Sequence, residues 1–133
     1  RPNLSKEAVL ADSVQNLLDR SIEHLQSRKA EDVILIDLQG IADFADYFLI
    51  CTGTSAVHVK ALSDAVLEGL KAEDIRPWQV EGYDSRKWIL IDYTDVIIHI
   101  FLPDTRTFYG LERLWGDAPI QQIEDEGTLV ETN

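Results

Sequence analysis

Two aspartates, Asp92 and Asp95, flank a short turn between two runs of strand-forming residues. Facing carboxylates can chelate a cation, and paired carboxylates hold the catalytic metal of nucleotidyltransferases. In those enzymes the two carboxylates stand one residue apart, whereas two residues separate Asp92 from Asp95. A transferase also needs a basic group for the triphosphate, and the sequence places none convincingly near the pair. The two aspartates therefore fit solvated turn residues better than a catalytic centre.

The segment Cys51-Thr52-Gly53-Thr54-Ser55 is a second candidate for chemistry, because it joins an expected strand to an expected helix. Free backbone N–H groups and the helix dipole at such a junction can bind an anion. The segment lacks the lysine and the glycine spacing of a phosphate loop. We favour a turn at Gly53 and a helix cap at Ser55. The alternative is a degenerate nucleotidyltransferase-like enzyme or nucleotide-binding module that combines this junction with Asp92 and Asp95.

The histidines and the cysteine indicate no metal centre. His24, His58 and His99 fall on three different expected elements, without the spacing of a zinc site. The single Cys51 excludes an internal disulfide and fits a reducing compartment. We therefore expect no cofactor and no metal.

Composition restricts the class of partner. The 133 residues are 45% hydrophobic, as in one globular domain, and carry a formal charge of −12. Affinity for nucleic acid comes largely from basic groups that neutralise phosphates, so direct nucleic-acid binding is not expected. No apolar run approaches the roughly 20 residues that span a bilayer. We expect a cytoplasmic protein of bacterial type; because residue 1 is not Met, an organellar relative with a removed leader is the other possibility.

Helices and strands alternate along the chain. Ser13 to Lys29 and the segment from Ser55 to about Lys71 have helical spacing of apolar residues, with Ser55 as the cap. Val33 to Leu38 and Tyr47 to Thr52 are expected strands, and Ile75 to Glu81 is a loop or an edge strand. The pattern predicts an α/β (α+β) domain in which helices flank a mixed sheet of about five strands.

The segment from Trp88 to Phe101 predicts a tight hairpin, with Tyr93 and Thr94 as its loop and Trp88 opposite His99. Side chains alternate between the two faces of a strand. One face is then purely aliphatic: Ile89, Ile91, Val96, Ile98 and Ile100. The other face is mixed: Trp88, Leu90, Ile97, His99 and Phe101, with the two aspartates at its tip. This second face is too apolar to be left in water, so a helix of the chain or a partner must cover it.

The C-terminal third predicts one more helix and an acidic end. Asp104 is the expected N-cap of a helix that runs to about Trp115. One side of this helix is expected to be core: Phe108, Leu111, Leu114 and Trp115. Tyr109 and Glu112 lie off that stripe and are expected to be exposed. We divide the chain into an N-terminal extension at 1–12, a domain at 13–119 and an acidic, disordered tail at 120–133.

Several separated motifs resemble the ribosomal silencing factor family, also called Iojap. They are Asp46 to Ser55 (DYFLICTGTS), His58-Val59, Val80-Glu81-Gly82, Trp88 to Ile100, and Arg106 to Trp115 (RTFYGLERLW). The likeness covers about Val14 to Pro119. It implies a fold similar to the nucleotidyltransferase core but without its catalytic apparatus.

The resemblance also implies a function. Family members bind the large ribosomal subunit through ribosomal protein number fourteen and block joining of the small subunit, which represses translation. Organellar relatives act in assembly of the large subunit, and relatives in isolation form homodimers. The chain is then a non-enzymatic repressor.

The mixed hairpin face supplies the expected contact residues. Aromatic anchors give most of the affinity of an interface, while charges at its rim set on-rate and orientation. We expect the partner contact to use eight residues: Trp88, Phe101, Tyr109, Glu112, His99, Leu111, Asp92 and Asp95.

Overall fold

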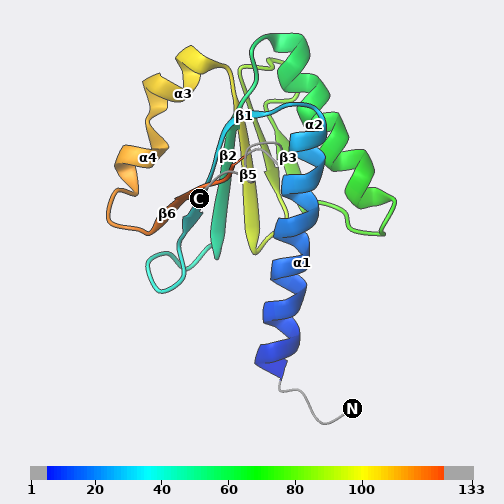
Figure 1. Ribbon diagram of the computed structural model, residues 1–133, viewed down its shortest axis with the longest axis vertical. Helices are drawn as coiled ribbons and strands as arrows, with labels where there is room; N and C mark the ends of the chain where they lie inside the picture. Colours follow the sequence, from blue (N-terminus) through cyan, green and yellow to red (C-terminus); the bar gives the residue numbers. More distant parts are fainter. Residues whose placement is uncertain (1–5, 125–133) are drawn as a thin grey trace.

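The computed structural model describes residues 6–124, with side chains described from residue 12 onward. Six strands form one sheet in the order β3-β4-β5-β2-β1-β6, and four helices flank it (Figure 1). The helices are α1 (Lys6–Ser27), α2 (Ala56–Lys71), α3 (Pro103–Tyr109) and α4 (Leu111–Leu114). The strands are β1 (Glu31–Asp37), β2 (Tyr47–Thr52), β3 (Gln79–Glu81), β4 (Trp88–Asp92), β5 (Val96–Phe101) and β6 (Ile120–Gln122).

The predicted mixed sheet is confirmed. Strands β2 and β5 pair in parallel at its centre, and the other four pairings are antiparallel. β5 is buried along its whole length, as expected for a central strand covered on both faces. β3 lies at one edge, where Pro77 just before it removes no ladder hydrogen bond.

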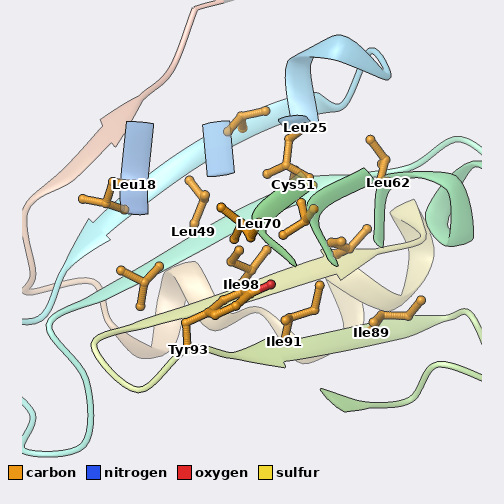
Figure 2. Packing of buried hydrophobic residues seen from close by; sticks show 14 of the residues in the cluster. Leu18, Leu25, Leu49, Cys51, Leu62, Leu70, Ile89, Ile91, Tyr93 and Ile98 are labelled. Atoms are coloured by element: carbon orange, nitrogen blue, oxygen red, sulfur yellow. The ribbon is translucent and has the colours of Figure 1, made fainter. Parts of the chain in front are cut away.

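The sheet separates two apolar clusters. Helices α1 and α2 lie together on one face, and α3 and α4 lie on the other (Figure 1). Figure 2 shows the first cluster, in which Leu18 and Leu25 of α1 and Leu62 and Leu70 of α2 pack on the sheet. The second cluster lies under α4 and the loop before β2, and it contains Phe101. The aliphatic face of the hairpin belongs to the first cluster and the mixed face to the second, as the alternation of side chains predicts.

Two helix predictions differ in their outcome. The cap of α2 is confirmed, because Ser55 accepts a hydrogen bond from the backbone N–H of His58 at 3.1 Å. Helix α1 begins at Lys6, seven residues before the predicted start at Ser13, so residues 6–12 do not form a separate extension. The apolar periodicity from Val14 onward marks only the part of α1 that packs on the sheet.

The predicted hairpin is present, but its register differs by two residues. Trp88 pairs with Phe101 and Leu90 with His99, and the two turn residues are Thr94 and Asp95. Tyr93, which was predicted to lie in the loop, instead continues the pairing through a backbone hydrogen bond to Val96. Its ring packs into the first cluster beside Ile91. A shift of an even number of residues leaves every side chain on its predicted face.

The single predicted helix from Asp104 to Trp115 is wrong. Gly110 adopts a φ of +55° and divides the segment into α3 and α4. The N-cap is Leu102 rather than Asp104, with Pro103 at the first helical position. The break changes the phase of the helix, so Phe108 and Leu114, which were expected in the core, are 77% and 70% exposed.

The end of the chain extends the sheet. β6 pairs with β1, so residues 120–122 belong to the domain and not to a disordered tail. The acidic residues 125–133 lie outside the described part, and the predicted disorder there is untested. Within residues 6–124, no helix is long and apolar enough to cross a membrane.

Candidate functional site: the hairpin aromatic cluster

The mixed face of the hairpin is the centre of a cluster of rings, which we name the hairpin aromatic cluster: Phe48, Trp88, His99, Phe101 and Tyr109. Trp88 stacks on Phe101 with ring centroids 4.9 Å apart and an interplanar angle of 28°. The Tyr109 ring also lies 4.7 Å from Trp88, at an interplanar angle of 47°. Trp88 is therefore a half-buried indole in contact with both a core ring and a ring of α3.

His99 fixes the orientation of Trp88. The indole Nε1–H of Trp88 donates to Nδ1 of His99 at 3.0 Å, so the neutral imidazole carries its proton on Nε2. His99 is 3% exposed and its ring lies 4.4 Å from the ring of Phe48. Burial disfavours the charged imidazolium and lowers the pKa of His99 to about 3.

The depressed pKa of His99 predicts an acid-sensitive fold. The unfolded chain, with a histidine pKa near 6.5, binds one more proton than the folded chain between pH 6.5 and about 3. The contribution of His99 to the free energy of unfolding should therefore be fully present above pH 6.5. It should fall by about 2–3 kcal/mol between pH 7 and pH 4.5. Urea titrations of the wild type and of His99→Asn at both pH values measure the difference. Equal pH dependence in the two proteins would show that His99 is not held neutral.

Two predicted contact residues are covered by the chain itself. Phe101 is fully buried and His99 nearly so, because the second cluster closes over them. The expectation that both present their side chains directly to a partner does not fit this burial. The cover that the mixed face requires comes from the chain's own α3, α4 and the loop before β2. Phe101 and His99 are thus supports of Trp88.

The exposed part of the site lies on α3, α4 and the loop before β2. Tyr109 is 50% exposed, as expected. These elements carry a set of exposed apolar side chains that we name the apolar rim: Phe44, Phe108 and Leu114. Phe108 contacts Tyr109, and Phe44 contacts Trp115 and Phe48. Sequence periodicity placed Phe108 and Leu114 in the core because it assumed one unbroken helix, and Gly110 inside that helix was the available signal of a break. Phe44 lies in a loop, for which periodicity gives no expectation.

Leu111 and Glu112 have internal partners. Leu111 is half-buried and packs against the second cluster. Glu112 accepts from Nε of Arg106 at 2.8 Å, with its side chain 33% exposed. Sequence reasoning quoted Arg106 within a motif and gave it no role. Its hydrogen bonds reach residues far away in the chain, which no local pattern reveals.

The two aspartates serve the turn. Asp92 accepts a hydrogen bond from the backbone N–H of Thr94 at 2.7 Å and is paired across the hairpin with Ile97, not with Asp95. The exposed Asp95 accepts backbone hydrogen bonds through its carbonyl from Asp46 and Tyr47. Burial, followed by the charge of Asp95 and that of Asp37, raises the pKa of Asp46. In the described part of the chain, no group of three or more acidic, histidine or cysteine side chains could hold a metal ion.

The junction from Gly53 to Ser55 uses its polar groups internally. The backbone N–H of Gly53 donates to the carbonyl of Phe101, and that of Thr54 donates to Nδ1 of His58 at 2.9 Å. Nε2 of His58 lies 2.8 Å from the carbonyl oxygen of Arg28. These hydrogen bonds hold the junction as a turn followed by a helix cap, which is the interpretation favoured from the sequence.

The sequence of this chain is similar to a known protein family and to named proteins of other organisms. The model of the family described as "Ribosomal silencing factor during starvation" matches residues 11–133. A protein of Halalkalibacterium halodurans named "Ribosomal silencing factor RsfS" is 39% identical over 112 residues, covering 84% of this chain and 96% of the relative. A mouse protein named "Mitochondrial assembly of ribosomal large subunit protein 1" is 33% identical over 121 residues, covering 86% of this chain and 53% of that protein.

A solved structure agrees with the sequence relatives. The crystal structure of a protein from Chromobacterium violaceum superposes with a TM-score of 0.75 at 31% identity, covering 88% of this chain and 95% of that one. The motifs noted in the sequence, from Asp46 to Trp115, lie within the matched residues of the family model. This chain therefore belongs to the ribosomal silencing factor family.

Proposed function

We propose that this chain represses translation by binding the large ribosomal subunit and blocking its joining with the small subunit. The observation that carries the proposal is the half-buried Trp88, which contacts Phe101 and Tyr109 near exposed apolar side chains of α3. Aromatic side chains that are rigidly held and partly exposed are favoured anchors of protein interfaces. Membership of a family of silencing factors supports the ribosome as the target.

The proposed partner surface on the large subunit is ribosomal protein number fourteen, as the family resemblance implies. The chain carries a formal charge of −12, and a basic ribosomal surface complements it. Trp88 and Tyr109 would make the central contact, with Leu111 beside them. Asp92 and Asp95, at the far end of the hairpin, would steer the approach as acidic groups. Phe101 and His99 would act from within, by keeping the Trp88 indole in place.

The proposed mechanism is steric and needs no catalysis. A domain that occupies the joining surface of one subunit excludes the other by volume alone. The name of the mouse relative refers to assembly of the large subunit, so an influence on ribosome assembly belongs to the same proposal. The apolar rim also gives the free chain a surface that a second copy can cover, so we place a homodimer of the free protein in this proposal, and a cytoplasmic location with it.

Co-sedimentation with isolated ribosomal subunits tests the proposal. The wild type is expected to sediment with the large subunit and not with the small one. Trp88→Ala is expected to weaken this binding by about 30-fold, the loss of one interface hot spot of about 2 kcal/mol. Circular dichroism of the variant should show that it remains folded at the temperature of the binding measurement.

Trp78→Ala is the matched control. Trp78 is 73% exposed beside the edge strand β3 and belongs to neither the aromatic cluster nor the apolar rim. This variant should bind like the wild type. Equal losses in the two variants, or none in either, would contradict the assignment of the site. A wild-type protein that sediments with neither subunit would overturn the proposed function.

A further inference from the structure

Helix α3 has little apolar anchorage of its own, whereas α4 packs on the second cluster through Leu111. Neither helix contains a fully buried residue, and α3 is only seven residues long. Short helices depend on tertiary contacts for their stability. Among the described residues, the side-chain hydrogen bonds between these two helices and the sheet all start from Arg106. A polar clamp therefore holds the segment that carries Tyr109.

The clamp has three hydrogen bonds around one guanidinium. One terminal nitrogen of Arg106 donates to Oγ1 of Thr52 at 2.7 Å and to the carbonyl oxygen of Asp32 at 2.8 Å, while Nε donates to Glu112 at 2.8 Å. The Arg106 side chain is 12% exposed. Asp32 adopts a φ of +47° where the pairing of β1 with β2 shifts register. Charge-assisted hydrogen bonds at a partly buried site are among the strongest that side chains form.

The clamp and the aromatic contact lie on one row of the sheet. Trp88 of β4 pairs with Phe101 of β5, which pairs with Thr52 of β2. Arg106 binds at the Thr52 end of this row, and Tyr109 contacts Trp88 at the other end. Residues three apart lie on the same side of a helix, so one turn of α3 makes both contacts.

We propose that Arg106 is the positioning residue of the partner face: its bonds to Thr52, Asp32 and Glu112 hold α3 so that Tyr109 lies on Trp88. The effect on ribosome binding rests on the proposed function above. Without the clamp, the arrangement that binds is populated for only part of the time, and the apparent affinity falls by that fraction.

The sign of the charge separates this role from electrostatic attraction. Arg106→Gln removes a positive charge from a chain whose formal charge is −12. A more acidic chain should approach a basic partner faster, not more slowly. A loss of affinity in Arg106→Gln therefore cannot come from long-range attraction and points to the geometry of α3.

The test compares Arg106→Gln with Arg113→Gln, which removes the same charge from an exposed residue of α4 with no ion pair among the described residues. The structural readout is the nuclear Overhauser contact between the Tyr109 and Trp88 rings, together with amide hydrogen exchange in residues 103–115. Arg106→Gln should lose the ring contact and exchange faster in this segment, while β2 and β5 keep their protection. Thr52→Val, which removes one acceptor, should show a smaller change in the same direction.

The binding readout uses the large subunit and a double-mutant cycle. Arg106→Gln should weaken binding by about tenfold, as expected if the competent arrangement falls to about a tenth of the population. Arg113→Gln, which carries the same change of charge, should bind at least as tightly as the wild type. In a Tyr109→Ala background, Arg106→Gln should cause little further loss, because the residue that it positions is absent.

The outcomes distinguish the two proposals. Intact ring contacts and wild-type exchange in Arg106→Gln would overturn the role of Arg106, whatever the binding result. Additive losses in the cycle, or an unchanged affinity despite lost ring contacts, would overturn its link to binding. A wild type that does not bind large subunits would contradict the proposed function alone, since the ring contact still reports on the clamp.

Discussion

Replacing Phe101 with alanine is expected to lower the free energy of unfolding by about 3–5 kcal/mol. The Phe101 side chain is fully buried, it stacks on Trp88, and it lies within the second apolar cluster. Removing the ring leaves a cavity beneath Trp88 and loses the transfer free energy of a large apolar group. Urea unfolding followed by circular dichroism measures the change.

Phe108→Ala is the matched control for this variant. Phe108 has the same side chain seven residues later, but it is 77% exposed on α3. Its replacement should change the free energy of unfolding by no more than about 0.5 kcal/mol. Similar losses in the two variants would mean that Phe101 is not core. Because Phe101 is buried and Phe108 exposed, the comparison also separates a residue that supports the site from one that lies on its surface.

Gly82→Ala is expected to be the most damaging single-methyl substitution near the site. Gly82 has a φ of +77°, and a Cβ added there would lie 2.0 Å from the carbonyl oxygen of Trp88. Backbone atoms of a strand cannot move away as a flexible side chain can, so Trp88 itself must shift. The free energy of unfolding should fall by about 3 kcal/mol or more, the sum of the left-handed backbone cost and overpacking.

Gly40→Ala isolates the steric part of that loss. Gly40 has nearly the same φ, +78°, but nothing lies within 4 Å of an added Cβ. This variant should lose only about 1–2 kcal/mol, the backbone cost of an L-residue at positive φ. Thermal or urea unfolding of the two variants measures the difference. An equal loss at both positions would refute the clash with Trp88.

A loss of stability in Gly82→Ala should be accompanied by weaker binding at temperatures where the protein is still folded. Gly82 lies in the loop that leads into Trp88, and the proposed contact depends on the position of that indole. Gly40 lies in the loop before β2, where an added Cβ meets nothing within 4 Å and does not touch Trp88, so its variant should lose less binding than Gly82→Ala. The pair thus links the backbone of one loop to the proposed function.

Local patterns in the sequence were sufficient to predict several elements. The apolar run from Tyr47 to Thr52 predicts β2 with its observed bounds, and Ser55 predicts the cap of α2. The alternation of residues along the hairpin predicts which side chains share a face, and the structure confirms both faces. These features follow from periodicity and capping, which act over a few neighbouring residues. The separated motifs also resembled the family to which the chain belongs.

The candidate site itself depended on contacts between distant residues. The register of the hairpin changed because burial of the Tyr93 ring outweighs the preference for a turn at that residue. The position of α3 depends on Arg106, whose partners Asp32 and Thr52 lie 74 and 54 residues away.

The sequence by itself therefore determined the family, the mixed sheet and the two faces of the hairpin. The tertiary structure alone decided that Phe101 and His99 are covered while Trp88 is half-buried and Tyr109 is exposed. The physical reason is that a residue's face depends on the local backbone, whereas its exposure depends on what the rest of the chain packs against that face.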